Sequence, residues 1–309
     1  MKKSSFQQPV IGITIGDPAG IGPEIIEKAV VFFAKQSRGP KLHAIGSAKG
    51  CKAGALSKTS AQRALDALEI SVDLLKKGKI NAVVNAPIHK ANISQIGFPF
   101  PGQTEFYAAR CGIPEDKVTM MLTSSKLTVS LVTIHCSLRD AIQKMTPTRI
   151  EQTVRHTIEV LMFRGIKTPR LAVCGLNPHA GENGLFGTEE IKVIAPTIAR
   201  LQKKYSQATI DGPFSPDTIF LRATKGEFDA VICMYHDQGL IPLKLIAFDS
   251  GVNVTLGLPF GRTSPDHGTA VNIAGKGIAS AASLISAIRL AAKLSSVALK
   301  QKTNNEKRV

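Results

Sequence analysis

Three histidines are the first candidates for chemistry, because each lies where an apolar run gives way to polar residues. His135 ends the run 127–134, His179 lies in the glycine-rich segment 177–187, and His236 follows the run 230–234. Ligands bind open α/β sheets beyond the carboxyl ends of the strands, so these side chains are expected to converge on one cleft. Three imidazoles with an open fourth position suit a catalytic divalent metal ion such as zinc, although their spacing matches no local metal motif. The alternative is that each histidine is structural or exposed.

Residues that can bind an anion follow His236. Lys244, Asn253 and Arg262 come at intervals of nine residues, and an arginine can clamp a phosphate or carboxylate with two parallel hydrogen bonds. A polar surface loop beside a structural histidine is the alternative interpretation for each residue. The whole cluster favours a binding site.

Short β-rich runs alternate with helical patterns, which predicts an α/β fold with a largely parallel sheet. We expect strands at 9–15, 81–87, 127–134, 170–175 and 228–234, and helices at 24–34, 60–77, 151–164, 188–204 and 280–299. The glycine loop 16–23 between the first strand and helix is expected to point backbone N–H groups at an anion. It lacks the third glycine of a dinucleotide-binding fingerprint, and the chain has no Walker A pattern.

The composition is that of an ordinary globular protein. The 309 residues are 43% hydrophobic, and no apolar run of about 18 residues predicts a membrane span. Residues 1–9 carry lysines but no apolar core of a secretory signal, so a cytoplasmic location is expected. The five cysteines form no Cys-x-x-Cys pair, which argues against a zinc ribbon or a disulfide framework.

A net charge of +16 raises the question of nucleic-acid binding. Four of the basic residues lie in the last ten positions, the chain has no tryptophan, and no basic run is interleaved with aromatic residues that could stack on bases. We therefore expect neither nucleic-acid nor membrane partners. A basic nucleic-acid-binding protein and a zinc hydrolase that works without a nicotinamide cofactor remain the lower-ranked alternatives.

Seven sequence blocks carry a resemblance to a known family. They are GDPAGIGPE (16–24), PGQTEF (101–106), LNPHAGENGLFG (176–187), GPFSPDTIF (212–220), MYHDQG (234–239), VNVTLGLP (252–259) and RTSPDHGTA (262–270). In this order they resemble the 4-hydroxythreonine-4-phosphate dehydrogenase (PdxA) family over nearly the whole chain.

The resemblance implies an α/β/α architecture like that of isocitrate and isopropylmalate dehydrogenases, with two domains flanking an active-site cleft. We place the first domain at 1–125 plus 268–309 and the second at 126–267. The implied reaction is the oxidation of 4-phosphohydroxy-L-threonine to a 3-oxo acid, which decarboxylates to 3-amino-2-oxopropyl phosphate in pyridoxal phosphate biosynthesis. It requires NAD or NADP and a divalent metal ion (zinc, magnesium or cobalt), in a homodimer with a shared active site.

The resemblance also implies roles for individual residues. His135, His179 and His236 would bind the metal ion, and Asp217 and Asp237 are hypothetical catalytic carboxylates that orient imidazoles or take a proton. The small phosphorylated substrate would contact Gln103, Thr104, Lys244, Asn253 and Arg262.

Two departures from the family pattern bear on the substrate. Gln103 stands where the family has histidine, and glutamine can donate a hydrogen bond but cannot carry charge. The chain also looks shorter than the family at 46–58. Both departures keep open a related substrate, such as 4-phosphothreonate or 4-phosphoerythronate, and Gln103 keeps open a non-catalytic family member.

Overall fold

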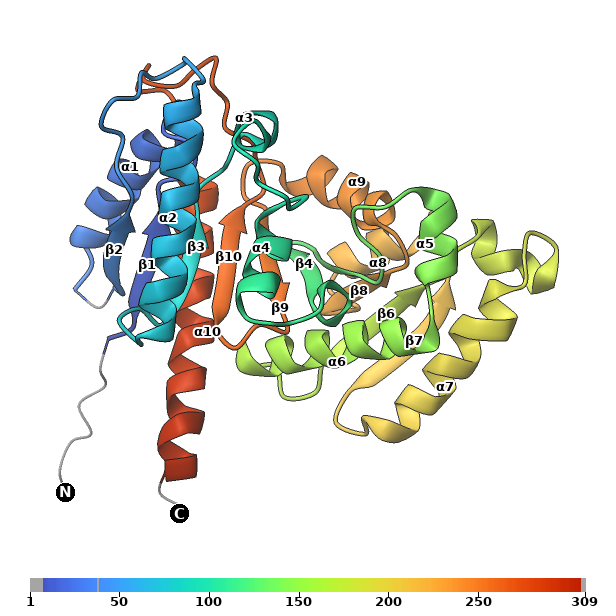
Figure 1. Cartoon of the computed structure of the whole chain (residues 1–309). Helices are drawn as coiled ribbons and strands as arrows, with labels where there is room; N and C mark the ends of the chain where they lie inside the picture. Colours follow the sequence, from blue (N-terminus) through green and yellow to red (C-terminus); the bar gives the residue numbers. More distant parts are fainter. Residues whose placement is uncertain (1–7, 38, 307–309) are drawn as a thin grey trace, which may run out of the picture. The chain divides into compact units, whose positions relative to one another are not determined.

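The computed structural model describes residues 8–37 and 39–306, and the chain divides into two compact units (Figure 1). The first unit comprises residues 1–110 and 259–309, and the second unit comprises residues 111–258. The basic ends considered above, residues 1–7 and 307–309, lie outside the described residues. Compactness alone defines these units, so the domain borders expected after residue 125 and before residue 268 stay a prediction.

The first unit is built on four parallel strands. Their order is β2 (Lys41–Ile45), β1 (Val10–Thr14), β3 (Ala82–Asn85) and β10 (Gly261–Pro265). The chain steps from β1 to β2 and then back past β1 to β3. Right-handed crossovers therefore put the two connecting helices on opposite faces. Accordingly, α2 (Lys58–Lys76) packs on one face, and α1 (Gly22–Ala34) and α10 (Ala282–Glu306) on the other (Figure 1).

Local sequence accounts for the helices of the first unit. Ser57 caps α2 in a capping box with Ser60, and Ala64, Leu68 and Val72 bury one side of the helix. Pro23 lies in the first turn of α1, where its missing N–H and fixed φ suit a helix start. Two short helices complete the unit, α3 (Lys90–Ser94) and α4 (Gln103–Arg110).

The glycine loop before α1 differs from its expectation. The N–H of Ala19 donates to the Asp17 carboxylate at 3.0 Å, and those of Gly20 and Ile21 donate to the carbonyls of Asp17 and Thr269. These donors are therefore taken by acceptors of the same unit and are not presented to an anion.

The second unit has six strands. Their order is β9 (Val252–Leu256), β4 (Thr119–Thr123), β5 (Thr128–Leu131), β8 (Ala230–Cys233), β6 (Arg170–Cys174) and β7 (Thr209–Phe214). The last four are mutually parallel, whereas β4 is antiparallel to both β5 and β9. A connection as short as the one between β4 and β5 can only join antiparallel strands. The largely parallel sheet predicted from the sequence is otherwise confirmed.

Two apolar layers cover this sheet. Along β8, Ala230 and Ile232 face the helices α6 (Pro147–Phe163) and α7 (Ala195–Lys204), while Val231 and Cys233 face α8 (Ile219–Thr224) and α9 (His236–Ala247) (Figure 1). This alternation makes the strand apolar throughout, as expected for a strand covered on both sides. The other helical segments are η1 (Glu115–Lys117), α5 (Leu138–Lys144), η2 (Pro178–Gly184) and η3 (Glu190–Ile194). Within the described part of the chain, no helix is both long and apolar enough to cross a membrane.

Candidate active site

Four parallel strands of the second unit end at one edge, and each is followed by a candidate residue. His135 follows β5, His236 follows β8, His179 follows β6 and Asp217 follows β7. The carboxyl ends of parallel strands share an edge, so this topology gathers side chains that are far apart in sequence. The strands β5 and β8 are neighbours, and the His135 and His236 rings lie beside each other.

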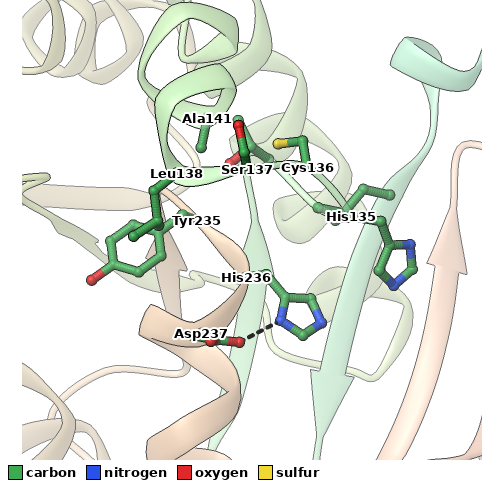
Figure 2. Close-up of a pocket in the computed structure, with 10 residues that line it drawn as sticks. His135, Cys136, Ser137, Leu138, Ala141, Tyr235, His236 and Asp237 are labelled. Atoms are coloured by element: carbon green, nitrogen blue, oxygen red, sulfur yellow. Dashed lines mark hydrogen bonds and ion pairs between the residues drawn. The ribbon is translucent and has the colours of Figure 1, made fainter.

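His135 and His236 line a pocket of about 480 Å³ formed by the β5–α5 connection and the start of α9 (Figure 2). Their ring centroids are 5.5 Å apart, and the rings are tilted by 44°. His236 Nδ1 lies 2.7 Å from Asp237 Oδ1, and Figure 2 shows the His236 ring between Asp237 and His135. With the proton on Nδ1, this ring donates to Asp237 and keeps the Nε2 lone pair for a metal ion.

The donor set suits a divalent metal ion but is incomplete within one chain. Two neighbouring imidazoles, here with ring centroids 5.5 Å apart, are typical ligands of zinc and similar ions. Among the described residues, however, no group of three His, Cys, Asp or Glu side chains is placed to hold a metal ion. Thus the structure pairs His135 with His236, and it does not bring His179 to them.

His179 lies instead near Asp217, on the β7 side. Ser215 Oγ donates to Asp217 Oδ1 at 2.6 Å and holds the pKa of that carboxyl below its usual value, and the nearby His179 imidazole acts in the same direction. His179 itself has φ of +52° and belongs to the left-handed stretch of η2. The glycine-rich loop expected here is therefore an ordered turn.

Two residues that the sequence did not single out fix the segments around the histidines. Gln238 is buried: its Nε2 donates to the Gly175 carbonyl at 2.8 Å, and its Oε1 accepts from Met234 N at 2.7 Å. It thereby ties the end of β6 to the end of β8. Thr133, just before His135, donates from both its backbone N and its Oγ1 to the Met234 carbonyl. The sequence block MYHDQG contains Gln238, but only the fold shows which groups it joins.

The other substrate-binding candidates of the second unit lie on α9 and β9. Lys244 follows Asp237 by seven residues on α9, so it lies on nearly the same face, about 10 Å further along the axis. Asn253 lies on β9, and its Oδ1 is buried without a hydrogen-bond partner among the described residues. A buried acceptor is normally satisfied, so this atom is a natural contact for a donor on a ligand.

In the first unit, Arg262, Gln103 and Thr104 lie together. Arg262 is only 3% exposed, and its guanidinium donates to Gln103 Oε1 at 2.7 Å, to Thr104 Oγ1 at 3.4 Å and to Asn85 Oδ1 at 2.8 Å. Gln103 Nε2 donates in turn to the Ala86 carbonyl at 3.2 Å. Burial lowers the pKa of Arg262 to about 10, which leaves the side chain cationic at neutral pH.

The network around Arg262 extends to residues that the sequence analysis missed. Asn85 Nδ2 donates to the Tyr107 hydroxyl at 2.8 Å, and that hydroxyl lies 2.6 Å from Ser71 Oγ. Tyr107 is fully buried, and burial raises its pKa. These side chains fix Arg262, because the hydrogen bonds of the network connect it to β3, α4 and α2 of the same unit.

Comparison with known proteins matches most of the chain to one family. The family model described as "Pyridoxal phosphate biosynthetic protein PdxA" matches residues 23–291. The chain is 42% identical to 4-hydroxythreonine-4-phosphate dehydrogenase of Beijerinckia indica, covering 92% of this chain and 94% of that protein. It is 40% identical to D-threonate 4-phosphate dehydrogenase of Cupriavidus necator, covering 93% and 97%.

A solved structure shares the fold. The crystal structure of 4-hydroxythreonine-4-phosphate dehydrogenase from Klebsiella pneumoniae superposes with a TM-score of 0.78 at 35% identity, covering 95% of this chain and all of that chain. The α/β fold implied by the resemblance to this family is thereby confirmed.

Proposed function

Because the chain belongs to the PdxA family, we propose that it is a nicotinamide-dependent dehydrogenase that oxidises 4-phosphohydroxy-L-threonine in pyridoxal phosphate biosynthesis. The C3 hydroxyl loses a proton and a hydride to become a ketone, and the 3-oxo acid loses carbon dioxide to give 3-amino-2-oxopropyl phosphate. The observation that carries the proposal within this chain is the His135–His236 pair in its pocket, with Asp237 bonded to one ring.

We propose that His135 and His236 hold a divalent metal ion, with zinc, magnesium and cobalt as candidates. When bound, such an ion lowers the pKa of a coordinated hydroxyl and stabilises negative charge on its oxygen, and the nicotinamide accepts the hydride. Asp237 keeps the His236 ring in the tautomer that presents Nε2. Asp217, whose carboxyl pKa is held low by Ser215, is ionised at neutral pH and can take a proton.

The remaining candidates bind the two anionic ends of the substrate. By the resemblance, Arg262 would contact the phosphate or carboxylate together with Gln103 and Thr104, and hydrogen bonds from all three of its nitrogens hold the buried guanidinium in one orientation. Lys244 supplies a second cation, and Asn253 supplies an acceptor for a hydroxyl or ammonium group of the substrate. Roles for these five residues are proposals from the resemblance, supported by this chemistry.

We further propose a homodimer in which His179 of the partner subunit completes the metal site. Support comes from the exposed apolar residues beside each histidine: Leu138 (66% exposed) and Ile142 after His135, Leu185 (73%) and Phe186 after His179, and Ile241, Leu245 (87%) and Phe248 on α9 after His236. Contiguous exposed apolar surface marks an interaction site. A two-fold partner would cover these residues and bring a second His179.

Subunit mixing tests this division of the ligands. His179→Ala and His236→Ala should each abolish activity. When the two variants are mixed and reassembled, half of the dimers are hybrids with one intact site out of two, so about a quarter of the wild-type activity should return. No recovery in confirmed hybrids would show that one subunit supplies all three ligands or that His179 is not one of them.

The activity itself is tested by following reduced nicotinamide absorbance with the purified chain, 4-phosphohydroxy-L-threonine, NAD or NADP, and a divalent metal ion. Turnover should appear and should be lost with a chelator, because the metal ion is needed to stabilise the alkoxide. Asp237→Asn should weaken metal binding, and Asp217→Asn should lower turnover with metal binding intact. Near wild-type turnover and metal content in both variants would remove these two carboxylates from the mechanism.

A second substrate is favoured by the relative from Cupriavidus necator, a D-threonate 4-phosphate dehydrogenase to which the chain is 40% identical. The resemblance adds that Gln103 stands where the family has histidine. The two substrates differ at C2, which carries an amino group in one and a hydroxyl in the other. A larger kcat/KM for D-threonate 4-phosphate in the same assay would assign the chain to that activity.

A further inference from the structure

The turn that carries His179 has a backbone conformation that needs support. His179, Ala180, Glu182 and Asn183 have φ of +52°, +52°, +42° and +55°, in the left-handed region. For residues with a side chain, this conformation costs about 1–2 kcal/mol each relative to the right-handed one. Four such residues in one turn persist only if their surroundings hold them there.

Glu190, at the start of η3, is the group that holds the beginning of this turn. Its Oε1 accepts hydrogen bonds from the backbone N–H of Leu176 at 2.7 Å and of Asn177 at 2.8 Å, and its Oε2 accepts from Asn177 Nδ2 at 3.0 Å. Glu189 Oε2 accepts from the same Asn177 amide at 2.8 Å. Leu176 and Asn177 lie just before Pro178 and His179, so these bonds set where the turn starts.

The carboxylate of Glu190 is also enclosed by the turn. It is only 3% exposed, and no ion pair to it occurs among residues 8–37 and 39–306. A side chain on Gly181 would place its Cβ 2.7 Å from Glu190 Oε2, and one on Gly175 would lie 3.1 Å from Oε1. A buried carboxylate satisfied only by N–H donors of one segment fixes that segment firmly, because losing any donor leaves charge uncompensated.

We propose that Glu190 is a positioning residue for His179. Its carboxylate holds Leu176 and Asn177 and thereby maintains the left-handed turn that directs the His179 imidazole. Glu190 acts through that geometry and not through contact with substrate. The inference rests on the proposed role of His179 as a metal ligand.

Glu190→Gln in the full-length dimer tests the inference. The glutamine keeps one acceptor oxygen, but its NH2 group meets the Asn177 amide, so a donor faces a donor. Zinc and cobalt affinities, measured by competition with a chromogenic chelator, should fall about 10–100-fold, the usual effect of removing a group that orients a ligand. Amide hydrogen exchange at Leu176 and Asn177 should accelerate. Glu159→Gln, the same change at a half-exposed site on α6, is the matched control and should alter neither quantity.

Two further variants distinguish failure of the positioning role of Glu190 from failure of the proposed metal-ligand set. Asn177→Ala removes only the side-chain donor, so it should give a smaller loss of metal affinity, and it serves if Glu190→Gln does not fold. His179→Ala reports whether His179 binds metal at all. If His179→Ala weakens metal binding but Glu190→Gln and Asn177→Ala do not, the positioning role is overturned while the proposed function stands. If His179→Ala leaves metal binding unchanged, the proposed ligand set fails and the positioning role fails with it.

Discussion

The two groups of candidate residues, one in each unit, are built in opposite ways. In the first unit Arg262 is buried, and Asn85, Gln103 and Thr104 of the same unit accept its hydrogen bonds. In the second unit His179 lies in a strained turn, followed by exposed apolar side chains. The comparison teaches that one chain alone can fix the orientation of the arginine proposed to bind substrate, whereas the proposed metal site depends on surface that one chain leaves uncovered.

The largest expected effect comes from Arg262→Lys. A lysine ammonium cannot reach the acceptors of Asn85, Thr104 and Gln103 together, and each buried acceptor left unpaired costs about 1–3 kcal/mol. We expect the free energy of unfolding to fall by about 2–4 kcal/mol and kcat/KM to fall by about 100-fold or more. Urea denaturation and the nicotinamide assay measure both.

The control is Arg289→Lys, the same change at an exposed residue of α10, whose guanidinium lies 5.1 Å from the centroid of the Phe32 ring. It should shift stability by about 0.5 kcal/mol or less. Equal small losses in both variants would mean that the buried network does not hold Arg262, and the contrast between the two regions would disappear.

In the second unit, Leu245→Glu should reduce activity while it leaves the stability of the isolated subunit nearly unchanged. Leu245 is 87% exposed on α9, so a charge there should change the stability of the isolated subunit by about 0.5 kcal/mol or less. The same charge in a proposed apolar interface should dissociate the dimer and reduce activity by about tenfold or more. Sedimentation velocity and the activity assay are the measurements.

Leu221→Glu on α8 is the matched control, because Leu221 is also exposed (62%) but follows none of the three histidines closely. It should remain dimeric and active. If Leu245→Glu behaves like this control, α9 does not contribute to a subunit interface.

Gln103→His has the smallest expected effect, and it tests the substrate contacts proposed for the first unit. A neutral histidine can replace both hydrogen bonds of Gln103, whereas a protonated histidine can carry charge toward a phosphate but no longer accepts from Arg262. KM should fall by up to about tenfold, with kcat and stability nearly unchanged. The ratio of KM values for 4-phosphohydroxy-L-threonine and D-threonate 4-phosphate shows whether the change is specific to one substrate. Identical kinetics before and after the substitution would remove Gln103 as an influence on the substrate.

The sequence predicted the elements whose signals are local. The amphipathic pattern of 60–77 became α2, and the apolar run 228–234 contains β8, because periodicity and β-branched residues reflect burial directly. Helix α9 was missed: it contains Gly239 and Pro242, which are poor helix formers, and tertiary packing on β5 and β8 supports it instead.

The sequence predicted that the three histidines lie at one edge of the sheet, but it did not predict how the structure groups them. The strand ends placed His135, His179 and His236 at one edge, and the sequence gives no sign that a left-handed turn separates His179 from the other two. That turn depends on Glu190, a long-range contact with no local pattern. Asn85 and Tyr107 were missed for the same reason, since their partners lie on different elements of the first unit.

Helix α9 carries His236 at its first residue and the exposed residues Ile241, Leu245 and Phe248 along its length. If one rigid helix serves both metal binding and subunit association, the two equilibria are thermodynamically linked. A metal ion that strengthens association by some factor must itself be bound more tightly by the dimer, by the same factor. The apparent metal affinity is therefore expected to rise with protein concentration, so that the enzyme loses its metal ion on dilution before it unfolds.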